Sequence, residues 1–183
     1  MRVGVLASGS GTNLQALLDA DDIDVVAVAS DQPAARALER AAAAGVEHRA
    51  FPRDEHPDRE ARDLAMADWL AGHGVELVVS AGYMRLLAPA FLARFPDRVI
   101  NVHPALLPAF PGLDGIADAL AYGVKVTGVT VHLVDEGVDT GRILLQEAIA
   151  VPEGIDRDGL HDLLRPLEHR LLVDAVRQFA RGD

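Results

Sequence analysis

Short, almost continuously apolar runs alternate with amphipathic stretches through residues 1–100, and this alternation constrains the fold more than any other feature. Parallel strands that helices cover on both faces are apolar on both faces, because neither face meets water. The apolar runs lie at residues 2–8, 24–30, 75–80 and 98–102. The helical patterns between and after them lie at residues 13–20, 33–44, 57–72 and 89–95. This order predicts an α/β fold with a doubly wound, mostly parallel sheet and a Rossmann-like N-terminal half.

Proline and glycine mark the ends of two of these helical patterns. Pro33 and Pro57 stand where a helix would begin, and Gly45 and Gly74 where one would end. Proline fits the first turn of a helix because the first amides have no partner within the helix, and glycine adopts the left-handed conformation that often ends one. We therefore expect helices to begin at these two prolines.

The pattern changes after residue 101. Residues 101–115 are rich in proline and glycine, so we expect a loop, followed by a short helix at 118–122. Alternating segments then predict an antiparallel hairpin, and the last segment predicts an amphipathic helix that Pro166 kinks or divides in two. The hairpin strands are expected at residues 125–135 and 142–151, and the helix at 156–180, with Leu160, Leu163, Leu164, Leu167, Leu171 and Leu172 on one face.

Length and composition exclude several classes of protein. A chain of 183 residues fits one domain, and the absence of Cys excludes disulfides, zinc–thiolate sites and a cysteine nucleophile. No apolar run approaches a membrane span and no signal peptide is recognisable, so we expect a soluble, cytoplasmic protein. With 17 Lys plus Arg against 28 Asp plus Glu, the net charge of -11 argues against general nucleic-acid binding.

A glycine-rich segment, Ser8-Gly-Ser-Gly-Thr-Asn13, joins the first predicted strand to the first predicted helix. One interpretation is a phosphate cradle made by Ser10, Gly11, Thr12 and Asn13, because the amides at the start of a helix attract anions. The other is an ordinary turn in which Thr12 or Asn13 caps the helix. The glycines only partly match a dinucleotide fingerprint, although Asp31 stands where a ribose ligand would be expected.

A second set of polar residues ends the fourth apolar run. Ligands of open parallel sheets bind beyond the carboxyl ends of the strands, and Asn101 and His103 follow the run directly. Residues two apart in an extended segment point to the same side. Asn101 would offer an amide donor and His103 a ring that gains or loses a proton near neutral pH, although a lone loop histidine is more often structural.

A third set lies in the hairpin turn, Asp135-Glu-Gly-Val-Asp-Thr-Gly141. Acidic residues beside glycines usually serve only to form a turn, and the segment lacks the ligand spacing of a calcium-binding EF-hand. The remaining sequence has no metal-ligand motif and no nucleophile elbow, so we expect no metal and a nucleophile supplied by a substrate.

Four blocks together resemble one family, the folate-dependent phosphoribosylglycinamide formyltransferases. The blocks are SGSGTNLQ at 8–15, AGYMRLL at 81–87, NVHPALLP at 101–108 with FPG at 110–112, and GVTVHLVDEGVDTG at 128–141. The resemblance implies transfer of the formyl group of 10-formyltetrahydrofolate to the amine of glycinamide ribonucleotide in purine synthesis. It also implies a single domain, residues 1–183, with a nucleotide-binding half at about 1–100 and a catalytic and folate half at about 101–183.

The resemblance carries roles onto individual positions. Asn101, His103 and Asp139 match the catalytic residues, and Leu107–Pro108 matches a cis proline. Around the ribonucleotide it implies Gly11, Thr12 and Asn13 of the loop, with Ser10 beside them, Glu168 and the cation Arg165. Around the folate it implies Arg59, Met84, Arg85, Leu86, Leu87, Asn101, Asp135, Glu136, Gly137, Val138 and Asp139.

The chain departs from the family after Gly112, where relatives often carry His and this chain has Asp114 and Ile116. Asp114 would place an acceptor near the cleft, or mark a surface loop that has drifted. Two other functions stay open: a formyltetrahydrofolate hydrolase, in which water replaces the amine, and an NAD-binding module that uses Gly9, Gly11 and Asp31. We expect a monomer or a homodimer.

Overall fold

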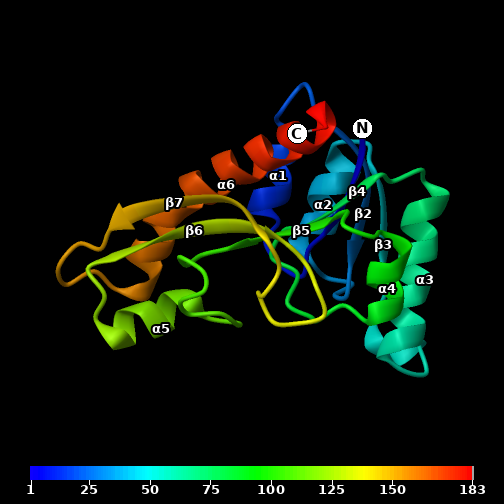
Figure 1. The fold of residues 1–183 in the computed structure, drawn as a ribbon. Helices are drawn as coiled ribbons and strands as arrows, with labels where there is room; N and C mark the ends of the chain where they lie inside the picture. Colours follow the sequence, from blue (N-terminus) through cyan, green and yellow to red (C-terminus); the bar gives the residue numbers. More distant parts are fainter. Residues whose placement is uncertain (183) are drawn as a thin grey trace. The chain divides into compact units, whose positions relative to one another are not determined.

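The computed structural model describes residues 1–182 and divides the chain into two compact units, Met1–Ile100 and the part from Asn101 on (Figure 1). Unit 1 holds four parallel strands in the order β3-β2-β1-β4. They are β1 (Arg2–Leu6), β2 (Asp24–Ser30), β3 (Glu47–Ala50) and β4 (Leu77–Ser80). Val5 of β1 lies opposite Val28 and Val79, so apolar residues from three strands meet at the centre of this sheet.

Helices cover both faces of the unit 1 sheet, with α1 and α2 on one side and α3 and α4 on the other (Figure 1). They are α1 (Thr12–Leu18), α2 (Arg36–Ala43), α3 (Arg59–Gly72) and α4 (Pro89–Arg94), with a 3-10 turn η1 (Arg53–Glu55) before α3. Their buried faces supply Leu14, Leu17, Met66, Leu70 and Phe91 to the core. The predicted doubly wound α/β class with a parallel N-terminal sheet is confirmed.

β5 (Val99–His103) begins in unit 1 and ends in unit 2. Unit 2 further contains α5 (Gly115–Tyr122), the antiparallel strands β6 (Val126–Leu133) and β7 (Ile143–Ala150), and α6 (Arg157–Arg181). α6 packs against both hairpin strands and α5 contacts α6 (Figure 1). The predicted hairpin and C-terminal helix are confirmed.

The local structure differs from the sequence-based expectations at several positions. Pro33 does not begin a helix, because Gln32–Ala35 forms a turn and α2 starts at Arg36. Pro57 does not begin one either, because Asp58 is the N-cap of α3 and the helix starts at Arg59. Strand β3 was not expected, because its sequence Glu-His-Arg-Ala is polar and its first three residues are exposed, as an edge strand permits. Of the two outcomes expected at Pro166, division into two helices is wrong, since α6 runs through Pro166 with buried leucines before and after it. On that helix Leu163 is 48% exposed, while the other five predicted core leucines are buried.

Candidate active site

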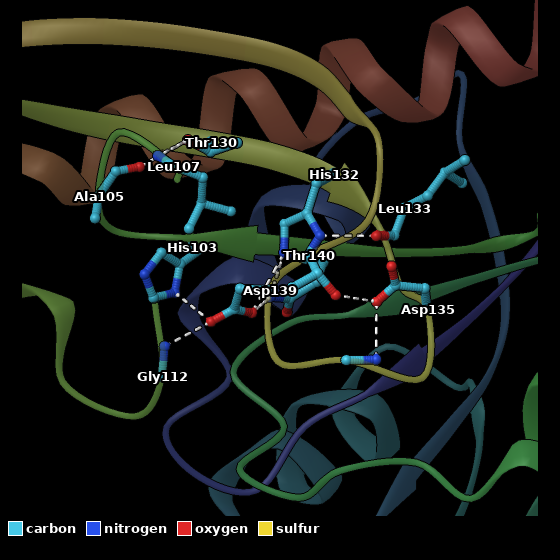
Figure 2. Close-up of polar contacts among 12 residues, drawn as sticks. His103, Ala105, Leu107, Gly112, Thr130, His132, Leu133, Asp135, Asp139 and Thr140 are labelled. Carbon is cyan, nitrogen blue, oxygen red and sulfur yellow. Dashed lines mark hydrogen bonds and ion pairs between the residues drawn. The ribbon is translucent and has the colours of Figure 1, made fainter. Parts of the chain in front are cut away.

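The end of β5 and the β6–β7 turn bring Asn101, His103 and Asp139 together in unit 2. Figure 2 shows His103 and Asp139 facing each other. His103 Nδ1 lies 3.5 Å from Asp139 Oδ2, and Asn101 Nδ2 lies 3.5 Å from Asp139 Oδ1. Since both β5 side chains reach the same carboxylate, they point to one side, as their spacing of two predicts. The arrangement joins an amide donor, an imidazole and a carboxylate in one polar cluster.

His132 of β6 is a fourth member of this cluster that was not singled out from the sequence. Its ring is 2% exposed; Nε2 lies 3.4 Å from Asp139 Oδ1 and 3.2 Å from Asn101 Nδ2. Nδ1 lies 2.7 Å from the Leu133 carbonyl (Figure 2), which can only accept, so Nδ1 carries a proton. The period of two along β6 was an available signal, because it places His132 and the buried Thr130 on one face.

His103 is held at both ring nitrogens. Nε2 lies 2.7 Å from the Phe110 carbonyl, and Nδ1 faces Asp139. Since a carbonyl oxygen only accepts, Nε2 carries a proton, and a second proton on Nδ1 would be donated to the carboxylate. The ring therefore has a polar partner at each nitrogen, which fixes its orientation.

The carboxyl of Asp139 is ionised at neutral pH for a structural reason. Burial alone raises its pKa, but hydrogen bonds from His132 and from the Gly112 amide (2.8 Å) and the charges of His103 and His132 outweigh burial and lower the pKa below its usual range. Its backbone φ of 53° is rare for a residue other than glycine. A residue keeps this unfavourable conformation only when surrounding contacts hold it, and the contacts of the Asp139 carboxylate do so here.

Asp135, four residues earlier, serves the turn itself. Its Oδ1 accepts hydrogen bonds from the Gly137 amide (3.0 Å) and the Thr140 hydroxyl (2.7 Å) (Figure 2). This is the Asx turn expected where acidic residues stand beside glycine. Glu136 and Val138 are exposed in the same turn. The segment thus combines one structural carboxylate with one that faces the cluster.

The loop after His103 is fixed by Thr130 and Gln146. The Thr130 hydroxyl donates to the Ala105 carbonyl (2.7 Å) and accepts from the Leu107 amide (3.1 Å) (Figure 2). Gln146 Nε2 donates to the same hydroxyl and to the Leu107 carbonyl, both at 2.9 Å. The Leu107–Pro108 bond is cis, as the resemblance implies.

Asp114 and Ile116, where the chain departs from its resemblance, have structural partners. Asp114 caps α5 by accepting from the Ala117 amide (3.2 Å), and its Oδ2 lies 3.1 Å from Arg157 Nε. Ile116 is 4% exposed and belongs to the core. The carboxylate expected near a cleft therefore has two partners outside the Asn101–Asp139 cluster.

Replacing Asp114 by Ala is expected to lower the free energy of unfolding by about 0.5–2 kcal/mol, because a helix cap is lost. The half-exposed ion pair with Arg157 adds little. Turnover should stay within about threefold of wild type, since the cluster keeps its own contacts. Urea denaturation and a steady-state assay measure the two effects, with Asp114→Asn, which retains a capping side chain, as control. If Asp114→Ala lost turnover tenfold while Asp114→Asn did not, the helix cap would be shown to affect the Asn101–Asp139 cluster, contrary to this prediction.

The glycine-rich loop of unit 1 is packed against α2. Gly11 is the N-cap of α1 in a left-handed conformation (φ 71°), and a Cβ there would lie 2.7 Å from Ala37 Cα. The carbonyls of Gly9 and Ser10 accept from the Ala37 amide (3.1 Å) and Arg40 Nε (2.8 Å). The expected side-chain cap by Thr12 or Asn13 is wrong, because Gly11 occupies the cap position without a side chain.

The other residues predicted to bind the substrates lie partly in unit 1 and partly in unit 2. In unit 1, Arg59 is exposed at the start of α3, and Arg85 donates from Nε to Asp31 Oδ2 at 2.9 Å. In unit 2, Arg165 Nη2 lies 2.9 Å from Asp162 Oδ1, and Glu168 is buried at 6% exposure. Asp31 also accepts from Ser8 and Gln32, so three donors already occupy the carboxylate that an NAD ribose would need.

The pKa of Asp31 lies below its usual range. Burial raises it, but hydrogen bonds from Ser8, Arg85 and Gln32, and the charge of Arg85, lower it by more. An acid whose folded pKa is depressed stabilises the fold above its unfolded pKa of about 3.9, and that stabilisation is lost as the pH falls through the folded pKa. We therefore expect Asp31→Asn to lower the free energy of unfolding by about 1–3 kcal/mol at pH 7 and by clearly less at pH 3.

Urea denaturation at the two pH values tests this expectation. Asp68→Asn is the control, because the Asp68–Arg94 ion pair is about half exposed on both sides and contributes little. An equal deficit of Asp31→Asn at both pH values would show that the charge of Asp31 is not what stabilises the fold.

Within residues 1–182 no helix is both long and apolar enough to span a membrane, and no three His, Asp or Glu side chains are grouped so that they could hold a metal ion.

Comparisons with known proteins extend over nearly the whole chain. The family model described as formyl transferase matches residues 1–176. A phosphoribosylglycinamide formyltransferase of Mycobacterium tuberculosis is 54% identical over 183 residues, covering 98% of this chain and 85% of that protein. The trifunctional purine biosynthetic protein adenosine-3 of Chironomus tentans is 39% identical over 188 residues, covering 99% of this chain and 14% of that protein. The crystal structure of glycinamide ribonucleotide transformylase 1 from Symbiobacterium toebii matches with a TM-score of 0.97 and 48% identity, covering 100% of this chain and 88% of that one.

Proposed function

Because the chain belongs to the formyl transferase family, we propose that it transfers a formyl group to the amine of glycinamide ribonucleotide in purine biosynthesis, with 10-formyltetrahydrofolate as the donor. The single observation that carries the chemistry is the cluster in which Asn101, His103 and His132 surround the Asp139 carboxylate at 3.5 Å or less. It combines proton carriers with an amide donor and contains no covalent nucleophile, so the amine of the substrate attacks.

The proposed reaction balances without a further reactant. The amine nitrogen forms a bond to the formyl carbon, whose oxygen becomes an oxyanion. Collapse of this tetrahedral intermediate breaks the bond to the folate nitrogen, which takes up one proton while the amine releases one. Donors aimed at such an oxyanion are commonly worth about 3–4 kcal/mol each. Asn101 Nδ2 is the proposed donor, and a protonated His103, whose two N–H groups face the Phe110 carbonyl and Asp139, would contribute its positive charge or turn its Nδ1–H from Asp139 to the oxyanion.

Asp139 is proposed to orient His103 and to accept or relay the proton of the amine, directly or through water. Its lowered pKa keeps it ionised but makes it a weak base, so the proposed role is to pass a proton on and not to hold it. Its contacts with two imidazoles give a released proton a short path to a second carrier. We expect Asn101→Ala and His103→Ala each to retain ribonucleotide binding and to lose turnover, and full activity in either variant would refute the role proposed for that residue.

The binding roles are proposed from the family resemblance. Ser10, Gly11, Thr12 and Asn13 would receive the ribonucleotide phosphate, with Glu168 and Arg165 as further ribonucleotide contacts. The folate contacts would come from Arg59, Met84–Leu87, Asn101 and Asp135–Asp139. Tight packing of Gly11 against Ala37 supports a preformed loop, because no larger residue fits there. We expect a monomer or a homodimer, which sedimentation would distinguish.

The decisive experiment follows loss of the formyl group from 10-formyltetrahydrofolate with and without glycinamide ribonucleotide. We expect loss only with the ribonucleotide, together with formation of its formyl derivative. Loss without the ribonucleotide would identify the hydrolase alternative instead. Thermal stabilisation by the ribonucleotide and by a non-reactive folate analogue, with NAD as the comparison, tests binding separately. Stabilisation by NAD alone would overturn the proposal.

A further inference from the structure

A short segment of unit 1, residues 82–88, is tied down near both ends by a buried carboxylate. It follows β4 and precedes α4, lies in neither a helix nor a strand, and ends at Ala88, the N-cap of α4. Asp31, at the end of β2, lies near its first half, and Asp63, on α3, holds its last residue. Neither carboxylate has a part in the reaction chemistry proposed above.

The first anchor works through Ser8. The Ser8 amide donates to the Gly82 carbonyl (3.0 Å), and the Ser8 hydroxyl accepts from the Met84 amide (2.9 Å). The same hydroxyl donates to Asp31 Oδ1 (2.5 Å), while Arg85 Nε donates to Asp31 Oδ2 (2.9 Å). Asp31 thereby fixes both the backbone at Met84, through Ser8, and the direction of the Arg85 side chain.

The second anchor is a buried ion pair. Asp63 Oδ2 accepts from the Ala88 amide (2.8 Å), and Asp63 Oδ1 accepts from Arg62 Nε (2.9 Å) and Nη2 (2.6 Å). The side chains of Asp63 and Arg62 are 0% and 4% exposed. A buried charge of this kind is costly unless it is fully paired, so the geometry at Ala88 is strongly constrained.

Between the anchors the segment presents its side chains to solvent. Met84 and Leu86 are each 52% exposed, and the Arg85 side chain is 51% exposed. Ser8, Asp31, Met84 and Arg85 border a hollow of about 560 Å³ in the same unit. Because Asp31 engages Nε, the two terminal nitrogens of Arg85 remain as donors for a ligand. A fixed backbone therefore carries two apolar side chains and one oriented cation.

We propose that Asp31 and Asp63 are positioning residues which hold the 84–86 face in the conformation that receives the formyl donor. This inference rests on the proposed function, which assigns Met84–Leu87 to the folate. Holding a binding surface in its bound conformation improves affinity by removing the cost of ordering it. Loss of either anchor should therefore weaken binding of the donor and leave the ribonucleotide unaffected.

The test compares Asp31→Asn with wild type in the formyl-transfer assay. The Asn side chain matches the shape of Asp but loses the charge that Arg85 and Ser8 bind. We expect the KM for 10-formyltetrahydrofolate to rise about 5–20-fold, while kcat and the KM for glycinamide ribonucleotide stay within about twofold. Equal increases in both KM values, or an unchanged donor KM, would overturn the inference. Asp68→Asn, on the exposed side of α3, is the matched control and should leave both KM values unchanged.

A second readout does not depend on activity. Hydrogen exchange at the Met84 amide should become faster in Asp31→Asn and Ser8→Ala, and at the Ala88 amide in Asp63→Asn, with little change at β1. Asp63→Asn risks unfolding because it leaves Arg62 buried and unpaired. If it does not fold, the double variant Arg62→Met/Asp63→Leu, which removes the ion pair without leaving an unpaired charge, tests the second anchor, and unchanged exchange at Ala88 in it would overturn that anchor. Unchanged exchange in Ser8→Ala would overturn the first anchor. Wild-type protein without formyl transfer but with protected 84 and 88 amides would instead refute the proposed function alone.

Discussion

Replacing Asp139 by Asn is expected to lower kcat for formyl transfer by about two to four orders of magnitude, the range commonly contributed by general acid–base catalysis. The substitution keeps the shape of the side chain and removes its charge. The amide can still contact Gly112, His103 and His132, but it can no longer accept a proton or stabilise an imidazolium. Affinity for glycinamide ribonucleotide should change by no more than about twofold, because the proposed phosphate contacts lie in another segment.

Steady-state kinetics and calorimetric titration with the ribonucleotide measure the two quantities for Asp139→Asn. Asp174→Asn is a matched control in the same unit, since Asp174 lies on α6 in a partly exposed ion pair with Arg177, 3.6 Å away. It should retain wild-type turnover. Full turnover in Asp139→Asn would refute the role given to this carboxylate, and loss of ribonucleotide binding would show that Asp139 acts in binding and not in the chemistry.

The parallel core of unit 1 was predictable because its cause is local. Strands covered on both faces must be apolar at nearly every position, and β1, β2 and β4 are. Edge strand β3 has no such requirement, and its residues Glu47–Ala50 pair with β2 through backbone groups that any sequence offers. The same reasoning explains Leu163: helical spacing places it beside the core face, but which neighbours cover it depends on tertiary packing.

The candidate site was predictable in part. The period of two in β5 puts Asn101 and His103 on one side, and the structure brings both to Asp139. The sequence around the turn does not distinguish the two aspartates: Asp135 bonds within its own turn, whereas Asp139 faces two imidazoles. That difference depends on the left-handed backbone at Asp139. The period of two along β6 could place His132 on the face of Thr130, but its part in the cluster follows from its contacts with Asp139 and Asn101, since a buried histidine on a strand is usually structural.

The net charge of the chain does not determine how anionic ligands would be bound; individual cations and their partners do. The net charge of -11 opposes anionic ligands, yet both proposed substrates are anions. Two of the cations proposed for them are already paired, Arg85 with Asp31 and Arg165 with Asp162. An ion pair of this kind fixes the direction of the arginine side chain but cancels part of its positive potential. Binding of the anionic substrates therefore depends on hydrogen-bond donors at defined positions more than on long-range attraction.

Gly115→Ala is expected to lower kcat by about tenfold to a hundredfold, which is large for a residue that has no functional group. Gly115 is buried at the start of α5, and a Cβ there would lie 2.9 Å from both His103 Nε2 and the Phe110 carbonyl. Those two atoms form the 2.7 Å contact that holds the imidazole, so the methyl group must move the ring, the carbonyl or the helix. Overpacking of this kind should also lower the free energy of unfolding by about 1–3 kcal/mol.

Gly72→Ala provides the matched control, because Gly72 ends α3 and a Cβ there meets nothing within 4 Å. Alanine is the better helix former, so this variant should be as stable as wild type or slightly more stable, with unchanged kcat. Urea denaturation and steady-state kinetics on both variants separate crowding at His103 from the general effect of replacing a helical glycine. If Gly115→Ala lost stability but kept wild-type kcat, the position of the His103 ring would not limit the reaction. Since Nε2 and the Phe110 carbonyl are the atoms that the methyl group meets, a lower kcat with an unchanged affinity for the ribonucleotide would support the role of His103.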